Sequence, residues 1–323
     1  MLDWTDRHCR YFLRLLSPNA VLYTEMVTTG AIIFGKGDYL QFDQAEHPVV
    51  LQLGGSDPEA MTKCAVLAQE RGYDEVNINV GCPSDRVKNG SFGACLMAMP
   101  DTVAANIRAM QNEVDIPVTV KCRIGIDDMD EYKDLDQFVR RVAEAGCQHF
   151  IVHARKAWLK GLSPKENRDI PPLNYPRVYD LKAQYPDLKI SLNGGIKTLE
   201  DSIKHLKTVD GVMIGREIYS NPYILSDFEK QLFANDTLLT RSDIVQAMIP
   251  YAQAQIEQGA RVWHIARHML GLFQGQAGGR IWRRYLSQHG TQRGATTDLL
   301  TDALEQVLEA QHKANEYQAS KPA

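Results

Sequence analysis

Cys82 is the residue whose surroundings suggest chemistry most directly. It lies in the turn Gly81-Cys82-Pro83, directly after a short apolar run that is typical of a strand. A thiol with a pKa of about 8.5 is protonated at neutral pH yet can release its proton, so a thiol raised above a sheet can protonate a carbon centre. A free cysteine is more often a small buried hydrophobe, and we interpret Cys64, Cys122 and Cys147 in that way. We predict that Cys82 is a general acid.

Glycines at the ends of two later apolar runs indicate a phosphate site. Asn193-Gly194-Gly195-Ile196 leads into a helix that begins near Thr198, and Gly215-Arg216 closes the next run in the same way. Free backbone N–H groups converge at such helix starts, and in β/α barrels a phosphate commonly lies between the last two strand-end loops. Two ordinary glycine turns are the alternative interpretation.

Lys121 and His153 end two other apolar runs. A buried lysine is costly without an anionic partner, and the pyrimidine edge of a reduced flavin is one such partner. A structural ion pair is the alternative for Lys121, and a hydrogen-bonded core histidine is the alternative for His153.

The elements that position these residues follow a repeated βαβ pattern to about residue 225. Polar residues end nearly every apolar run, which favours a closed barrel, with its single mouth, over an open doubly wound sheet. We predict seven strands, at residues 21–26, 49–53, 75–80, 118–123, 149–153, 189–193 and 211–214. Because a closed barrel has eight, we expect that the first strand is absent from this chain and that Met1 follows directly after it.

Beyond about residue 235 only helix-period patterns remain. The predicted fold is therefore α/β, a TIM (β/α)8-type barrel with a C-terminal all-α domain. We place the catalytic barrel domain at residues 1–235 and the helical domain at residues 236–323.

Charge is spread unevenly along the chain. The net charge of -4 gives no general attraction to polyanions, but seven arginines and only two acidic residues lie between Arg241 and Arg293. Arg280, Arg283 and Arg284 occupy one predicted helix face, interleaved with Trp282 and Tyr285, which suits phosphate binding. A solvated helix face is the alternative.

Several protein classes are disfavoured. The six cysteines form no CxxC pair, which argues against a disulfide framework and against a zinc site, so we expect no metal. No stretch approaches the roughly 20 apolar residues of a membrane span, and nothing resembles a signal peptide, so we expect a cytoplasmic protein.

The motifs together resemble those of the tRNA-dihydrouridine synthases. The similarity rests on residues 1–7, 52–55, 79–83, 121–123, 153–155, 193–195 and 215–216, and residues 153–164 and 267–275 are similar to the A subfamily. The resemblance implies FMN-dependent reduction of the C5–C6 double bond of D-loop uridines, at about position 20/20a of tRNA, with NADPH as the reductant. Cys82 then protonates C5 of the uracil.

The resemblance also implies roles for individual residues. FMN contacts carry over to Met1, Gln52, Lys121, His153, Asn193, Gly194, Gly195, Gly215 and Arg216. Asn79 carries over as the contact to the uracil edge, and Lys165 and Arg168, in the long loop from residue 156 to 175, carry over as tRNA contacts. With Arg280 and Arg283 they make up the expected tRNA-binding set. We expect a monomer with no obligate protein partner.

Two other functions remain open at this point. A flavin barrel that reduces a free pyrimidine-like metabolite would share the phosphate site and Lys121, but would not need an arginine-rich helical domain. A catalytically idle RNA-binding barrel would keep the arginines but would have no reason to keep Cys82, Lys121 and His153 together.

Overall fold

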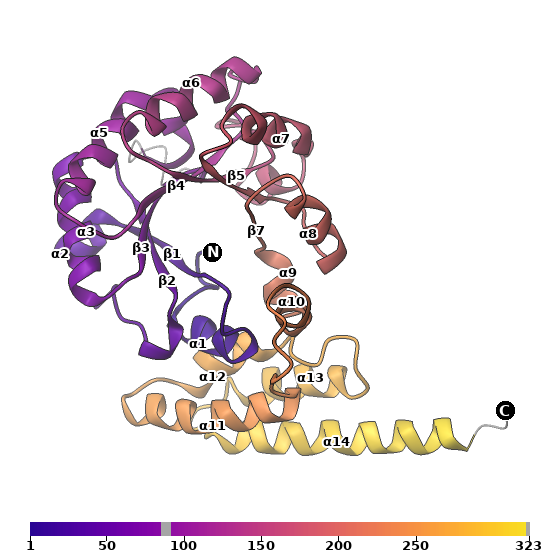
Figure 1. Cartoon of the computed structure of the whole chain (residues 1–323). Coiled ribbons are helices and arrows are strands. Elements are labelled where there is room, and N and C mark those ends of the chain that lie inside the picture. Colours follow the sequence, from indigo (N-terminus) through magenta and orange to yellow (C-terminus); the bar gives the residue numbers. More distant parts are fainter. Residues whose placement is uncertain (85–91, 321–323) are drawn as a thin grey trace. The chain divides into compact units, whose positions relative to one another are not determined.

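Seven parallel strands form one curved sheet, in the order β1 to β7 (Figure 1). The computed structural model describes residues 1–84 and 92–320. Among these residues no strand pairing joins β1 to β7, so the sheet is a TIM-type half-barrel that stays open. All seven predicted strands are confirmed, and β3 to β6 have the predicted bounds. The strands are β1 Leu22–Thr28, β2 Val49–Gly54, β3 Glu75–Val80, β4 Val118–Arg123, β5 His149–His153, β6 Lys189–Asn193 and β7 Gly211–Met213.

Helices cover the outer face of this sheet (Figure 1). They begin and end where the sequence supplies capping groups: Asp57 accepts a hydrogen bond from the Ala60 N–H, and Gly72 ends the same helix with φ of 90°. The strands are apolar on both faces because one face packs on helices and the other fills the barrel interior. The covering helices are α2 Thr29–Phe34, α3 Pro58–Arg71, α5 Pro100–Gln111, α6 Tyr132–Ala143, α7 Tyr175–Gln184 and α8 Leu199–Leu206.

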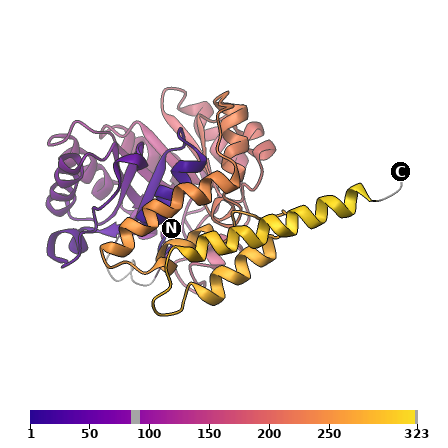
Figure 2. The ribbon, with the colours of Figure 1, turned by 90° about the horizontal axis from the view of Figure 1, so that it is seen from below.

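A second compact unit is entirely helical and combines residues 3–20 with the chain from Gly215 onward. Within it, α14 packs along α13 and α11 (Figures 1 and 2). No helix of the described residues is long and apolar enough to cross a membrane. The helices of this unit are α1 Arg7–Leu16, α9 Arg216–Ser220, α10 Ile224–Leu232, α11 Arg241–Glu257, α12 Val262–Ala266, α13 Gly279–His289 and α14 Asp298–Ala319.

The two compact units differ from the predicted domains, 1–235 and 236–323. The chain divides after Ile214, so α9 and α10 belong to the helical unit, and α1 joins them from the other end of the sequence. The physical reason is that α1 buries Phe12 and Leu16 and packs against α10, α11 and α12. The amphipathic pattern of α1 predicts a buried face but not the helices that cover it.

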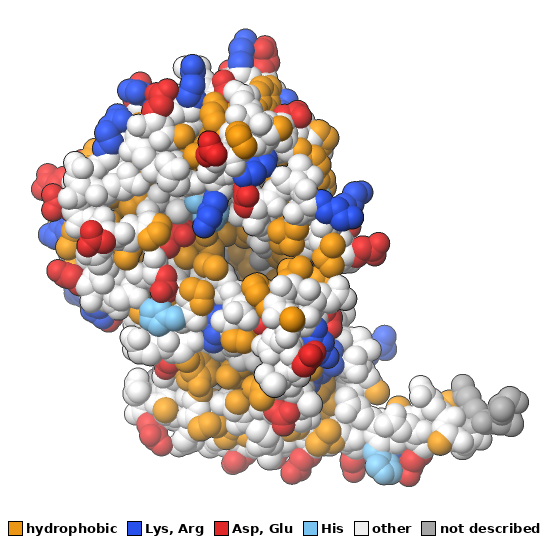
Figure 3. Space-filling model, viewed as in Figure 1, with side chains coloured by type: hydrophobic (Ala, Val, Ile, Leu, Met, Phe, Trp, Pro, Cys, Tyr) orange, Lys and Arg blue, Asp and Glu red, His pale blue; other side chains and the backbone are white. Residues whose placement is uncertain are grey.

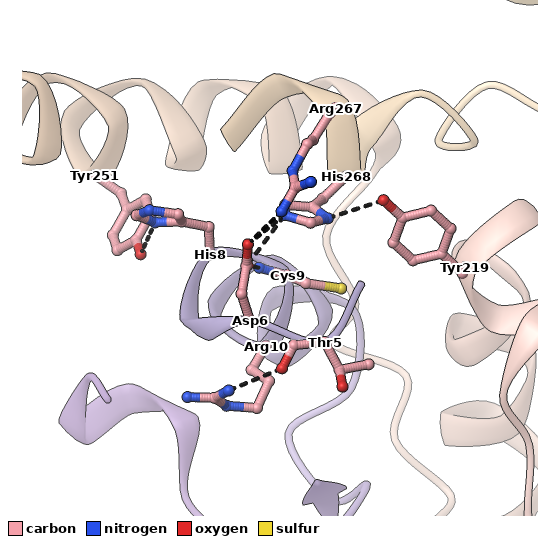
Figure 4. A network of polar contacts seen from close by, with 9 residues as sticks. All are labelled: Thr5, Asp6, His8, Cys9, Arg10, Tyr219, Tyr251, Arg267 and His268. Atoms are coloured by element: carbon pink, nitrogen blue, oxygen red, sulfur yellow. Dashed lines mark hydrogen bonds and ion pairs between the residues drawn. The ribbon is translucent and has the colours of Figure 1, made fainter. Parts of the chain in front are cut away.

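Asp6 holds α1 in place within the helical unit (Figure 4). Its carboxylate accepts a hydrogen bond from the Cys9 N–H at 3.0 Å, which caps the helix. The same carboxylate forms ion pairs with Arg267 at 2.7 Å and with His268 at 3.0 Å. The other ring nitrogen of His268 lies 3.1 Å from the Tyr219 hydroxyl. One carboxylate therefore joins the start of α1 to the segment that follows α12.

We predict that Asp6→Asn destabilises the helical unit by about 1–3 kcal/mol at pH 7, because the cap oxygen stays while two charge-assisted contacts are lost. Burial alone raises the pKa of Asp6, but His268, the Cys9 N–H and Arg267 outweigh it and hold the pKa well below its usual value. This stabilisation is present above the unfolded pKa of about 3.9 and is lost as the pH falls through the lower folded pKa.

Urea unfolding at pH 7 and at pH 3, followed by the fluorescence of Trp4, Trp263 and Trp282, measures this difference. The difference between wild type and Asp6→Asn is expected to shrink at the lower pH. Asp57→Asn is the matched control, because Asp57 caps α3 and forms no ion pair with any described residue. A cost for Asp6→Asn that is the same at both pH values would show that the charge is not the stabilising feature.

Candidate functional site

The parallel register brings the predicted site residues of four strands to one edge of the sheet. Asn79 on β3 pairs with Lys121 on β4, and His153 on β5 pairs with Asn193 on β6. Gln52 on β2 lies beside them, because it is hydrogen-bonded to Asn79. The carboxyl ends of parallel strands are where β/α barrels hold their active sites.

The Asn79 side chain shapes the turn that carries Cys82. Its Oδ1 accepts hydrogen bonds from the N–H groups of Gly81 at 3.1 Å and Cys82 at 2.9 Å. Its Nδ2 donates to Gln52 Oε1 at 2.8 Å. The Cys82 thiol is half-buried, with Sγ 3.6 Å from the Ser84 hydroxyl. Asn79 therefore fixes the backbone of the thiol residue, and among the described residues only one of its two amide N–H groups has a partner.

Behind this turn, a chain of buried hydrogen bonds runs across the inner face of the sheet. Gln52 Nε2 donates to Asn77 Oδ1 at 2.9 Å, and Asn77 Nδ2 donates to the Thr119 hydroxyl at 2.9 Å. Thr119 in turn donates to Glu75 at 2.5 Å. Sequence reasoning missed Asn77 and Thr119. The available signal was two polar residues at inward positions of otherwise apolar strands.

Lys121 is deeply set, and no described residue forms a hydrogen bond or an ion pair with it. Burial, and then the nearby charge of Arg123, lower the pKa of Lys121 to about 8. An anion beside the ammonium group would relieve both effects. Lys121 therefore fits an anionic group of a ligand.

The turn after β6 has two glycines at positions where a side chain would clash with neighbouring residues. Gly194 and Gly195 have φ of 110° and 74°, in the region that favours glycine. A Cβ on Gly194 would lie 3.2 Å from His153 Nε2, and one on Gly195 would lie 2.5 Å from Leu173. Asn193 donates to the Met213 carbonyl at 2.7 Å, so it ties β6 to β7. Together with Lys121, this glycine turn fits a cofactor that carries phosphate and approaches the backbone closely.

The remaining predicted cofactor contacts are divided between the units. Met1 belongs to the barrel unit and is 37% exposed. Gly215 and Arg216 lie at the start of α9 in the helical unit. Their contacts with FMN stay predictions. In the described ranges, no group of three or more His, Cys, Asp or Glu side chains could hold a metal ion.

The long loop after β5 is ordered by a residue that sequence reasoning did not single out. Asn167 is fully buried, and its Nδ2 donates to the carbonyls of Trp158, Leu162 and Ser163. Its Oδ1 accepts from the Trp158 N–H at 2.7 Å. The predicted tRNA contacts Lys165 and Arg168 lie on either side of Asn167 and are both exposed. The loop thus presents two cations on a hydrogen-bonded frame.

In the helical unit, the predicted arginine stripe lies on the exposed face of α13. Arg280, Arg283 and Arg284 are all exposed, and Arg283 donates to Gln274. Trp282 corrects one expectation: it is fully buried and donates to the Met269 carbonyl at 2.8 Å, so it belongs to the core and not to the stripe. Acidic side chains (red) line the lower edge of this unit in Figure 3, and α14 supplies Asp302, Glu305, Glu309 and Glu316.

A family model described as dihydrouridine synthase (Dus) matches residues 1–311 of the chain. The chain belongs to the dihydrouridine synthase family. The tRNA-dihydrouridine(20/20a) synthase of Vibrio parahaemolyticus is 59% identical over 309 residues, which cover 95% of each chain. The protein of the same name from Escherichia coli K12 is 60% identical over 311 residues, 96% of this chain and 90% of the relative.

Among solved structures, a 2-naphthoyl-CoA reductase in complex with 2-naphthoyl-CoA has a similar fold, with a TM-score of 0.51 and 9% sequence identity. The match covers 71% of this dihydrouridine synthase and 47% of the reductase chain. At this identity the likeness shows the barrel fold alone.

The buried chain behind the turn yields a stability prediction for this dihydrouridine synthase. Thr119→Val removes a hydroxyl that accepts from Asn77 and donates to Glu75, so the buried Asn77 amide loses an acceptor and Glu75 keeps only the longer contact with the Tyr23 hydroxyl. We expect a loss of about 1–3 kcal/mol in the free energy of unfolding of the barrel unit. Urea unfolding, followed by the fluorescence of Trp158 in variants that lack the other tryptophans, measures it.

Thr62→Val is the matched control. The Thr62 hydroxyl is buried and has no hydrogen-bond partner in the described part of the chain, so the same substitution there is expected to be neutral or stabilising. Equal losses in both variants would show that valine itself, and not the broken hydrogen-bond chain, lowers the stability.

Proposed function

We propose that this dihydrouridine synthase reduces the C5–C6 double bond of D-loop uridines, at about position 20/20a of tRNA, to 5,6-dihydrouridine. FMN is the proposed cofactor and NADPH the proposed reductant. The supporting observation is the Cys82 thiol, which the Asn79 side chain holds at the strand-end edge that also carries Lys121. The identity of about 60% to proteins named tRNA-dihydrouridine(20/20a) synthase supports the substrate and the position.

The residues of this edge have separate tasks in the proposed reaction. Bound FMN would supply the chemistry of hydride transfer, from NADPH to C6 of the uracil. Negative charge then develops on C5 and the adjacent carbonyl, and Cys82 donates a proton at C5. Lys121, whose pKa is lowered by burial, would stabilise negative charge on the bound cofactor. Asn79 has one N–H left to donate to a uracil carbonyl, and its other polar groups hold the Cys82 turn.

Each unit offers its own surface for RNA. In the barrel unit, Lys165 and Arg168 flank Asn167 on the loop after β5. In the helical unit, Arg280 and Arg283 lie on the exposed face of α13. Because phosphate contacts give affinity without reading sequence, these residues bind the tRNA backbone while the site at the strand ends selects a uridine.

Replacement of Cys82 tests the proposed proton donor. Cys82→Ala is expected to retain bound FMN and NADPH oxidation, while reduction of unmodified tRNA falls by roughly 10²–10⁴-fold, the usual loss for a general acid. Cys95→Ala is the matched control, because Cys95 is also half-buried and free. Wild-type tRNA reduction by Cys82→Ala would end the assignment. A wild-type protein that oxidises NADPH and leaves tRNA uridines untouched would favour a free pyrimidine as the substrate.

Replacement of Arg283 tests whether the arginine stripe binds tRNA. Arg283→Ala is expected to weaken tRNA binding and to lower the slope of log Kd against log salt by about 0.7–0.9, the contribution of one phosphate contact. Flavin content should stay the same. Lys313→Ala removes another exposed cation, one that is paired with Glu309 on α14, and is expected to leave the slope unchanged. If Arg283→Ala leaves the slope unchanged, Arg283 does not contact a tRNA phosphate and the stripe is only a solvated helix face.

A further inference from the structure

Arg123, the last residue of β4, is 4% exposed. Its guanidinium group donates hydrogen bonds to backbone carbonyls. Its Nε donates to the Gly81 carbonyl at 3.1 Å. Its Nη1 donates to the carbonyls of Asn167 at 2.9 Å and Lys156 at 3.3 Å. No acidic side chain of the described residues pairs with it. Burial of a charged group that has only carbonyl partners among the described residues costs free energy, which indicates a functional reason for the position of Arg123.

The carbonyls that Arg123 holds belong to two different functional segments. Gly81 directly precedes Cys82 in the turn that Asn79 shapes. Lys156 and Asn167 belong to the loop after β5, and Asn167 lies between the exposed cations Lys165 and Arg168. The guanidinium is planar and rigid, so donors from one group fix the spacing between the turn and the loop.

We propose that Arg123 is a positioning residue that couples contact of tRNA with the loop to the placement of the Cys82 thiol. The proposal rests on the proposed function in one respect, namely that the loop meets tRNA. The loop transmits displacement because Asn167 ties its backbone to Trp158, Leu162 and Ser163. A shift at Lys165 or Arg168 therefore reaches the Asn167 carbonyl, and through Arg123 it reaches Gly81.

The charge of Arg123 serves the same site. Burial lowers the pKa of the guanidinium to about 10, so the group stays charged at neutral pH. Cys82 lies close enough to the guanidinium to offset part of this lowering of the Arg123 pKa. The charge of Arg123 therefore lies beside the residue whose backbone it places.

Hydrogen–deuterium exchange of the FMN-loaded protein tests the coupling without reference to activity. Asn167→Ala alters the loop, and its side chain has no hydrogen bond to the turn, yet we expect faster exchange in peptides over residues 79–84 as well as 156–168. Arg123→Lys should raise exchange in both peptides, because one ammonium group cannot reproduce the fork. Arg141→Gln, which removes an exposed ion pair with Asp101, is the matched control and should change neither.

Addition of unmodified tRNA sharpens the test. In wild type, tRNA is expected to slow exchange in both peptides, whereas in Arg123→Lys it should slow exchange in the loop alone. If Asn167→Ala fails to fold, Asn167→Asp is the milder variant, because it keeps the acceptor for the Trp158 N–H. The coupling would be wrong if a folded Asn167 variant exchanged at the wild-type rate over residues 79–84.

Kinetics separate this inference from the proposed function. We expect Arg123→Lys to lower kcat for tRNA reduction by roughly 10- to 100-fold, as a misplaced reacting group does, with NADPH oxidation and KM for tRNA little changed. If exchange in the turn and the loop is coupled but the wild-type protein does not reduce tRNA, the proposed function is wrong and the coupling stands. If the wild-type protein reduces tRNA but exchange in the two peptides is not coupled, the coupling is wrong and the proposed function stands.

Discussion

The hydrogen bonds of the Asn79 side chain fix the geometry of the strand-end edge of the barrel unit. One amide satisfies two N–H groups of the Cys82 turn and donates to Gln52 on the neighbouring strand. From there every donor points the same way, through Asn77 and Thr119 to the Glu75 carboxyl. Hydrogen bonds aligned in one direction polarise one another. Inside a barrel, a polar group that loses its partner cannot form a hydrogen bond with water instead. The turn is therefore placed by the whole inner face of the sheet.

The strands could be predicted from sequence because their signal is local. Apolar runs on both faces and polar residues at their ends suffice to place β3 to β6 and to bring Asn79, Lys121 and His153 to one edge. Sequence placed Arg123 at a strand end, but its contacts and those of Asn167 were not predicted, because they involve backbone carbonyls distant in sequence, which no residue pattern records. The placement of α1 escaped prediction for a related reason: an amphipathic helix does not specify its partner.

Comparison with the naphthoyl-CoA reductase separates architecture from chemistry. At 9% identity a TM-score of 0.51 is retained, so the curved parallel sheet tolerates nearly complete replacement of its side chains. What the sheet supplies is a row of neighbouring strand ends. We propose that the residues at those ends, and the buried groups that hydrogen-bond to them, give this dihydrouridine synthase its own chemistry.

The helical unit draws its first helix from one end of the chain and the rest from the other. Asp6 and His268 are 262 positions apart, so at synthesis rates of about 5–20 residues per second α1 leaves the ribosome on the order of 10–50 seconds before its partners exist. During that interval Phe12 and Leu16 have no surface to bury against. The strands of the barrel unit are therefore synthesised before the helices that cover α1, and assembly of the helical unit awaits synthesis of α10 to α14.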